Sequence, residues 1–456
     1  MYFRPFSIYS PTCGIFQTRN KGKMTSPHPR PIERYHATRH FLGFDSCVVA
    51  SAKYASRNGT GFSKDILFAA LHQVINEHPA LGVKLQNEST SNARFTRLEN
   101  IDLSRIVEFS DHDNLQMALE SQLARNFDTD ADFPLWRIQV LNDNSVLLAI
   151  HHVIGDGLST VAFHTSLLQA LRNFTPGGSQ FIQIPDSAVL LPPVDAVTSL
   201  RPSPSTILTE MHKLHASKSW TSASSAWSGN PVPRAASVRT NVRLMSFPPP
   251  DITVFCALCR KHRATVTSAL YVLTVSIISR MIEPDPARYK TIASGVAISL
   301  REASGISNTV ICDFASAHYT YPAADPIFSW AAAARYAVAL QKQKRTAREK
   351  VGMLRFLFGK FVPYMQGHLD TKRGCGFVLS NLGRFDAPTA EDSWNIAQVL
   401  FAQCDVVIGA AFKLSVVCDP SGVLNIVFTW GDQSIGRDFV ESFMSQFQGA
   451  FRDLLA

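Results

Sequence analysis

The residues best suited to chemistry form the run HHVIGDG at positions 151–157. The run places two imidazoles, a carboxylate and two glycines directly after the apolar segment 145–150. A neutral imidazole can accept and return a proton near pH 7, because its unperturbed pKa is about 6.5. A single histidine at a strand end is usually structural, but this seven-residue pattern indicates acid–base chemistry.

The two histidines are expected to serve different purposes. Segment 145–152 predicts a strand, and successive side chains on a strand point to opposite faces. A metal shared by both imidazoles is therefore disfavoured, and one imidazole is expected to be functional while its neighbour packs behind it. In the predicted loop 153–157, Asp156 is suited to a buried ion pair, and Gly157 allows a backbone path that a Cβ would obstruct.

The pattern H-H-x-x-x-D-G resembles the signature of acyltransferases with the chloramphenicol acetyltransferase-like fold. Within that group the chain is most similar to the fungal alcohol acetyltransferase family. The D-F-G-W-G motif of the plant branch is absent, which argues against a plant-like acceptor class. The supporting segments, in chain order, are Glu33–Tyr35, Arg39-His40, Cys47–Tyr54, Pro134–Trp136, Ser380–Gly383, Gly409–Leu414 and Leu424–Trp430.

The resemblance implies a reaction as well as a fold. It implies two lobes of mixed helix and sheet (α+β), with a tunnel between them that admits acyl-coenzyme A from one side and an alcohol from the other. His152 is the implied general base, and the acyl group passes directly to the acceptor hydroxyl without an acyl-enzyme. Acetyl-CoA or another short acyl-CoA is the expected co-substrate, and no metal is expected.

Further site residues are also carried by the resemblance. Ser380 and Asn381 are the candidate donors to the tetrahedral oxyanion. Asp156 is expected to turn away from the acyl centre and to pair with Arg301, so that both, like Gly157, are structural. The basic run Lys342, Lys344, Arg345 and Arg348 offers candidates for the phosphates of coenzyme A, although a solvated helix face is the commoner explanation of such a run.

The expected organisation is a basic tail (1–30), an N-terminal lobe (31–195), a crossover linker rich in Pro and Ser (196–240) and a C-terminal lobe (241–456). Neither half shows a strict βαβ rhythm, which favours α+β or mixed α/β lobes. The periodicity predicts helices at 63–77, 115–123, 159–172, 208–217, 252 into the 270s, 328–349 and 439–455. It predicts strands at 47–52, 135–141, 145–152, 242–247, 291–300, 376–379, 399–401, 410–417 and 424–428.

Composition excludes several classes. The 456 residues are 46% hydrophobic and 18% charged, which is typical of a globular protein. Five of the eight net positive charges lie in the first 30 residues, so the basic balance is no argument for nucleic-acid binding. The eight cysteines read as reduced thiols, and no segment has the length and apolarity of a membrane span. We expect a cytoplasmic monomer; a transit peptide in the tail or a loose membrane association is compatible with the same sequence.

Three functions fit these observations. The first is a stand-alone O-acyltransferase that acetylates an alcohol, such as a hydroxylated secondary metabolite. The second is a condensation-type enzyme that takes its acyl group from a carrier protein or acylates an amine. The third is a non-catalytic homologue that only binds a ligand, although the complete set of His152, Asp156, Gly157 and Ser380 argues against it.

Overall fold

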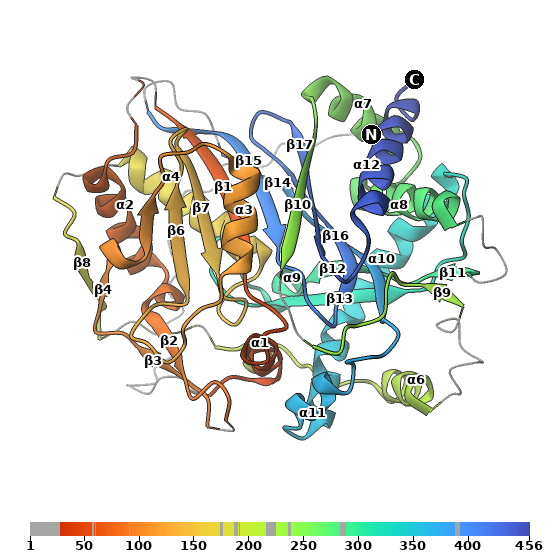
Figure 1. Ribbon diagram of the computed structural model, residues 1–456, viewed down its shortest axis with the longest axis horizontal. Helices are drawn as coiled ribbons and strands as arrows, with labels where there is room; N and C mark the ends of the chain where they lie inside the picture. The colour runs from red at the N-terminus through yellow and green to blue at the C-terminus, as the bar shows by residue number, and fades with distance from the viewer. Residues whose placement is uncertain are drawn as a thin grey trace, which may run out of the picture.

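A computed structural model of the chain describes residues 28–456 except 57–58, 60, 91, 174–176, 187–189, 191, 216–224, 236–238, 283–288 and 388–392. Nearly all of the predicted tail and parts of the predicted linker therefore lie outside the described residues. Helices and strands mix in both halves around two separate sheets (Figure 1). The expectation of a mixed helix-and-sheet fold is confirmed, while the predicted domain boundaries stay predictions.

The first sheet has the strand order β15-β1-β7-β6-β5. Its central strand β7 carries only buried residues (VLLAI after Ser145), which suits a strand covered on both faces. Helices α2 and α4 pack in the core on one face, and α3 packs on the other. The bounds are β1 Val48–Ala55, α2 Lys64–Glu77, β5 Val107–Phe109, α3 Leu115–Ala124, β6 Trp136–Val140, β7 Ser145–Ile150, α4 Gly157–Arg172 and β15 Asn395–Gln403.

The second sheet has the order β10-β17-β16-β14-β12-β13. Its apolar face is covered by helices that include α8 and α12, and the predicted Phe-rich face of α12 buries Phe443, Phe447 and Phe451 in that core. The bounds are β10 Thr240–Phe247, α7 Pro249–Lys261, α8 Val266–Ile282, β12 Ser294–Ser299, β13 Ala315–Thr320, α10 Trp330–Met353, α11 Phe361–Gln366, β14 Cys375–Arg384, β16 Ala410–Cys418, β17 Leu424–Gly431 and α12 Arg437–Asp453.

The two halves contact each other along a boundary that we call the seam. Strand β15 follows β14 of the second sheet in sequence but pairs with β1 of the first, from Val48 opposite Gln403 onwards. At the edge of the second sheet, the backbone N–H of Val242 donates to Oε1 of Glu120 on α3 at 2.9 Å. Helix α1 (Pro31–Phe41) lies below the gap between the sheets and contacts α10 and α11 (Figure 1). The seam is therefore crossed by backbone, side-chain and helix contacts.

The structure corrects three of the expected elements and adds a helix. The strand predicted to reach 152 ends at Ile150, so both histidines lie just beyond it. Helix α4 begins at Gly157, because Asp156 caps it, so Gly157 is helical and not in a loop. The single helix predicted from 252 is instead two helices, α7 and α8. Arg263 lies between them and has a left-handed φ of 56°. Helix α1 was not predicted at all.

The remaining elements are short, except for the 12-residue helix α6. They are η1 Pro79–Gly82, β2 Val83–Gln86, β3 Arg94–Arg97, β4 Asn100–Asp102, η2 Leu103–Arg105, β8 Phe181–Gln183, α5 Val194–Val197, α6 Pro204–His215, β9 Ala226–Trp227, β11 Thr291–Ile292, α9 Arg301–Ser304 and η4 Leu354–Leu357.

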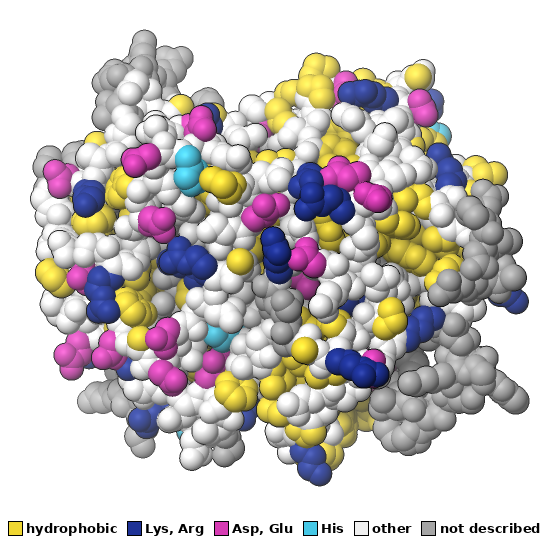
Figure 2. Space-filling view, in the orientation of Figure 1, with side chains coloured by type: hydrophobic (Ala, Val, Ile, Leu, Met, Phe, Trp, Pro, Cys, Tyr) yellow, Lys and Arg dark blue, Asp and Glu magenta, His cyan; other side chains and the backbone are white. Residues whose placement is uncertain are grey.

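The surface carries both signs of charge. On the face seen in Figure 2, Lys and Arg side chains alternate with Asp and Glu side chains and form no field of a single sign. In the described part of the chain, no single helix is long and apolar enough to cross a membrane. Only α7 and α8 taken together meet that test, and they are bent by 95°.

Candidate active site

The two motif histidines point into different surroundings. The His151 side chain is 1% exposed, whereas the His152 side chain is 17% exposed. The backbone N–H of His151 still donates to the carbonyl of Leu135, at 2.9 Å, and the chain then turns so that the N–H of Val153 donates to Nδ1 of His151, at 3.0 Å. His151 is therefore sealed and fixed by its own turn, and His152 alone of the two is partly exposed.

His151 belongs to a buried network with Glu88 and His40. Oε1 of Glu88 lies 3.5 Å from Nε2 of His151 and 2.9 Å from Nδ1 of His40, and the N–H of Phe127 donates to Nε2 of His40 at 3.1 Å. Burial lowers the pKa of His151 to about 4. Burial alone would raise the pKa of Glu88, but its contacts with His151 and His40 lower it to about 2. The distal nitrogens of both rings accept backbone N–H groups, so each ring presents its other nitrogen to Glu88.

His152 belongs to a second network with His36 and Asp313. Its ring stacks on that of His36 with centroids 3.8 Å apart. Oδ2 of Asp313 lies 3.2 Å from Nε2 of His36, and Oδ1 lies 3.6 Å from Nδ1 of His152. Burial raises the pKa of Asp313 well above its usual value and lowers the pKa values of both histidines. The partly exposed His152 is thus backed by a sealed carboxyl.

Each network brings its three ligand atoms within 4.8 Å of one another, which is close enough for a metal ion. A histidine that ligates a metal through one nitrogen normally donates the hydrogen of the other. In the first network both distal nitrogens face backbone N–H groups. In the second, Nδ1 of His36 lies 2.7 Å from the guanidinium of Arg39. Because these nitrogens must accept, the donor pattern favours hydrogen-bonded networks over metal ligation.

Asp156 and Arg301 form a fully buried ion pair at 2.6 Å. Asp156 also caps α4, since its Oδ1 accepts the N–H of Ser159 at 2.9 Å, and its Oδ2 accepts the N–H of Phe314 at 3.2 Å. The arginine donates to the carbonyls of Val310 and Cys312 at 2.6 and 2.9 Å. The pair therefore holds segment 310–314, which leads into β13 of the second sheet, against the motif.

Strand β14 separates the two oxyanion candidates. Ser380 is buried and shares a strand face with Leu382, which lies against Gly157 of the motif. Asn381 lies on the opposite face, where its amide donates to Oγ1 of Thr267 at 3.0 Å and its carbonyl accepts the N–H of Gly383 at 2.8 Å. The structure brings Ser380 to the seam but directs Asn381 towards α8.

Gly157 is required by close packing and not by an unusual φ. A Cβ on Gly157 would lie 2.8 Å from both Cδ2 of Leu382 and Cζ of Phe401. Those two side chains come from β14 and β15, so the first turn of α4 touches the strands that cross the seam.

The basic run lies on α10. Lys342 and Lys344 are exposed and Arg348 is half-buried, while the Arg345 side chain lies outside the described residues. Nothing in these positions decides between a solvated face and contact with phosphates, so both remain predictions.

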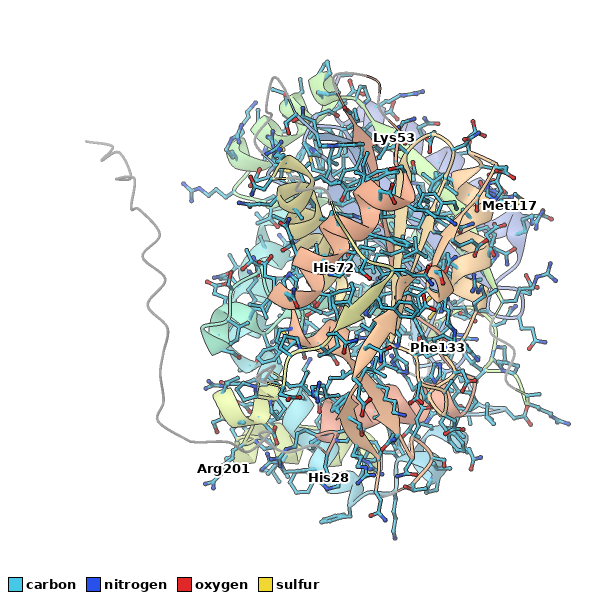
Figure 3. All side chains as sticks on the ribbon, turned by 90° about the vertical axis from the view of Figure 1, so that its left-hand side faces the viewer. His28, Lys53, His72, Met117, Phe133 and Arg201 are labelled. Atoms are coloured by element: carbon cyan, nitrogen blue, oxygen red, sulfur yellow. The ribbon has the colours of Figure 1, made fainter. Side chains whose placement is uncertain are left out.

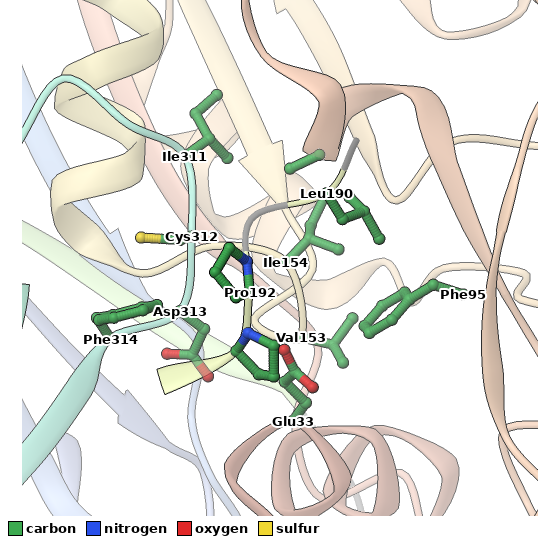
Figure 4. Close-up of a pocket in the computed structure, with 12 residues that line it drawn as sticks. Glu33, Phe95, Val153, Ile154, Leu190, Pro192, Ile311, Cys312, Asp313 and Phe314 are labelled. Carbon is green, nitrogen blue, oxygen red and sulfur yellow. The ribbon is translucent and has the colours of Figure 1, made fainter. Parts of the chain in front are cut away.

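A small hollow of about 50 Å³, partly open to solvent, lies behind the motif turn (Figure 4). Val153 and Ile154 line it together with the carboxyls of Glu33 and Asp313. Burial raises the pKa of Glu33 to about 7. Asp313 therefore separates this hollow from the histidine pair.

Comparison with known proteins identifies the family. The profile of the alcohol acetyltransferase family matches residues 31–283 and 358–451. The chain belongs to this family. It is 25% identical over 436 residues to the probable alcohol acetyltransferase FCK4 of Fusarium pseudograminearum, covering 86% of this chain and 85% of that relative. The prediction of an acetyltransferase enzyme, drawn from the motif, is confirmed.

Solved structures with little sequence identity share the fold. TRI3 trichothecene 15-O-acetyltransferase of Fusarium sporotrichioides superposes with a TM-score of 0.70 at 10% identity, covering 92% of this chain and 93% of that one. The starter condensation domain of rhizomide synthetase RzmA, in complex with C8-CoA and Leu-SNAC, gives 0.59 at 12% identity, with 94% of each chain covered. The predicted chloramphenicol acetyltransferase-like architecture is thereby confirmed.

Two residues of this site, His36 and Asp313, were not predicted from the sequence. His36 stands four residues before His40, a spacing that places both on one face of a helix and was available as a signal. Asp313 lies in an irregular segment with no motif around it, and only the folded chain brings it to His152.

Proposed function

We propose that this acetyltransferase moves the acetyl group of acetyl-CoA directly to the hydroxyl of an alcohol, with His152 as the general base. The observation that carries the proposal is the position of the His152 ring, which is partly exposed just beyond β7 of the first sheet and faces Asp313 just before β13 of the second. A base at this seam can meet two substrates that enter from opposite sides.

In the proposed reaction, Nε2 of His152 takes the proton of the acceptor hydroxyl. The alkoxide oxygen forms a bond to the thioester carbonyl carbon, and the carbonyl electrons move to oxygen. When the tetrahedral intermediate collapses, the carbon–sulfur bond breaks, and the protonated imidazole returns its proton to the thiolate of coenzyme A. A positioned base of this kind contributes about 10² to 10⁴ in rate.

The oxyanion needs a donor that is in place before the reaction. Ser380 is the candidate we retain, because it is buried on the strand face that meets the motif helix. Removal of one such donor typically costs about 3 to 4 kcal/mol of transition-state stabilisation. Asn381 would act at most through the turn it holds at Gly383, since its amide is already engaged.

Acyl-CoA as donor is supported by the family and by the bound C8-CoA of the RzmA domain. The division into lobes 31–195 and 241–456 and the tunnel between them belong to the same proposal. A monomer is sufficient for it, because His152, Asp313 and Ser380 come from one chain. Replacement of Lys342 and Lys344 by Ala tests the phosphate role: a raised KM for acetyl-CoA at constant kcat would indicate contact with the phosphates.

The test incubates the purified full chain with radiolabelled acetyl-CoA and a panel of primary, secondary and phenolic alcohols. Parallel reactions offer amines of matched shape, and others replace acetyl-CoA by an acetylated carrier protein. Labelled ester from free acetyl-CoA is the expected product. Transfer only to amines, or only from the carrier protein, would show that a condensation-type reaction is the correct assignment.

A further inference from the structure

We propose that Asp313 and His36 are positioning residues for the base: the Asp313 carboxylate holds the proton of His152 on Nδ1 and so leaves Nε2 free to accept the proton of the acceptor. The inference rests on the proposed function, because it gives His152 the role of base. It assigns to α1 and to segment 310–314 a part in the reaction that neither the motif nor the family match assigns.

Asp313 is placed to accept from both rings. Its side chain is 1% exposed, and neither carboxylate oxygen has a hydrogen-bond partner of good geometry among the described residues. One oxygen lies 3.2 Å from Nε2 of His36 and the other 3.6 Å from Nδ1 of His152. The backbone N–H of Ala315 also bonds this carboxyl and lowers its pKa. A buried carboxylate needs further compensation, and the two ring N–H groups are donors that can provide it.

The tautomer of His36 follows from Arg39. The guanidinium of Arg39 can only donate, and it lies 2.7 Å from Nδ1 of His36. Nδ1 therefore accepts, the hydrogen of the neutral ring sits on Nε2, and it points at Asp313. Arg39 is itself held by an ion pair with Asp45. The carboxylate thus has a fixed donor on one side and the motif histidine on the other.

Asp156 of the motif helps to position Asp313. Asp156 accepts the N–H of Phe314, directly after Asp313. Arg301 and Ser159 bind Cys312, directly before it: the arginine donates to its carbonyl at 2.9 Å, and its N–H donates to Oγ of Ser159 at 3.1 Å. The ion pair that caps α4 therefore clamps both neighbours of Asp313, which gives Asp156 an indirect role in orienting the base.

The gap of 3.6 Å between Asp313 and His152 is longer than a hydrogen bond. Contacts of catalytic groups in a substrate-free site are often long and tighten in the substrate complex. Stacking on His36 already restricts the His152 ring to one plane, with the two rings 9° from parallel. The ring of His152 also hydrogen-bonds its own backbone carbonyl, so Asp313 is one of two acceptors available to it.

The charges around the pair determine how it titrates. From α1, the side chains of Glu33, His36 and Arg39 face Asp313; Asp156 faces it from the motif; and Asp45 faces His152. Burial raises the pKa of Asp313 and lowers that of His152, so the two groups titrate together. The form able to act as a base carries one proton between Nδ1 and the carboxylate and none on Nε2.

The other network supplies a matched control. Glu88 is also a buried carboxylate between two histidines, but its partner His151 is sealed and accepts on Nδ1 from Val153. Glu88→Gln removes a buried carboxylate beside the motif in the same way as Asp313→Asn, without touching the base.

The decisive experiment determines the tautomer of His152 in the free, full-length protein by two-bond ¹H–¹⁵N correlation of ¹⁵N-histidine-labelled samples, with the signal assigned by its loss in His152→Ala. We expect the Nδ1–H tautomer in the wild type and in Glu88→Gln, and its loss in Asp313→Asn. An Nε2–H tautomer in the wild type, or an unchanged Nδ1–H tautomer in Asp313→Asn, would overturn the inference. No substrate is present, so this result stands apart from any failure to find acetyl transfer.

A second variant keeps the proposal open to refutation if Asp313→Asn does not fold. His36→Phe keeps the stacked ring but removes the donor to Asp313, so the pair should hold its proton more strongly and the acidic limb of kcat/KM should move to higher pH, by about one unit. Asp313→Asn should move the limb to lower pH and reduce kcat by about 10²- to 10⁴-fold, with a smaller change in KM. If the limb of His36→Phe stays in place, His36 only fills space and the inference is wrong.

Discussion

The rings of His36 and His152 lie face to face, with centroids 3.8 Å apart and planes 9° from parallel. One turn further along α1, His40 meets His151 with centroids 4.3 Å apart. Two histidines four apart on a helix thus pair with two adjacent histidines beyond a strand, and each pair shares one carboxylate, Asp313 or Glu88 for the respective pairs. The composition of the two pairs is the same. The greater exposure of the His152 side chain distinguishes the candidate base from its structural neighbour His151.

Asp156→Ala should destabilise the fold strongly. It leaves the guanidinium of Arg301 buried without its counter-ion, which typically costs about 3 to 5 kcal/mol. It also frees the backbone around Asp313, so acetyl transfer should fall as well. Urea unfolding measures the loss. As a control, Asp386→Ala breaks an exposed pair with Arg384 and should change the free energy of unfolding by less than about 1 kcal/mol. Equal effects of the two substitutions would contradict the clamp.

The buried rings of His151 and His164 should make the fold less stable as the pH drops from about 6.5 to 4. Burial lowers the pKa values of His151 and His164 to about 4 in the folded state, while the unfolded chain titrates near 6.5. Between these values the unfolded state binds more protons, so the free energy of unfolding decreases with falling pH, by up to about 3 kcal/mol for each histidine. Urea unfolding at pH 7, 5.5 and 4.5 measures the slope, and His151→Asn should reduce it. Burial raises the pKa values of Glu33 and Asp313, and these two carboxyls act in the opposite direction, so the test is the difference between the two proteins. An unchanged slope in His151→Asn would show that this ring is not buried in the neutral form.

Gly157→Ala should destabilise the protein even though alanine favours helices. The new Cβ would approach Leu382 and Phe401 to 2.8 Å, and overpacking of this kind costs about 1 to 3 kcal/mol. Gly449→Ala, one turn before the end of α12 where nothing lies within 4 Å of the new atom, should instead stabilise by about 0.5 to 1 kcal/mol. Thermal unfolding of both variants gives the signs, and a stabilising Gly157→Ala would refute the close approach.

The sequence predicted the parts of the site that are local, and the resemblance added one long-range partner. The seven-residue motif marked the position of the candidate base, and the family pattern pointed to Arg301 as the partner of Asp156. The exact end of β7 was missed because the sequence shows no break between Ile150 and the two histidines. The strand ends because the chain turns there, and the N–H of Val153 donates to the ring of His151. Asp313 had no signal, because its role depends on a segment whose path is fixed by contacts from α4 and α9.

The side chains of the two oxyanion candidates alternate along β14, and the sequence alone did not predict which face each one occupies. Ser380 and Asn381 looked equivalent as a polar pair in sequence. The period of two along a strand directs one to the seam and the other to Thr267 on α8, and the faces could be assigned only once the neighbouring core residues Phe377 and Leu379 were placed.

The most direct test of the central claim compares acetyl transfer by the wild type and by His152→Ala under saturating acetyl-CoA. His72→Ala is the control, since His72 on the outer side of α2 (Figure 3) bonds the carbonyl of Ser179 away from the site. The account predicts that His152→Ala unfolds at nearly the wild-type temperature and loses about 10² to 10⁴ in kcat, while His72→Ala keeps its activity. A folded His152→Ala variant that transfers acetyl groups at a rate close to that of the wild type would contradict it.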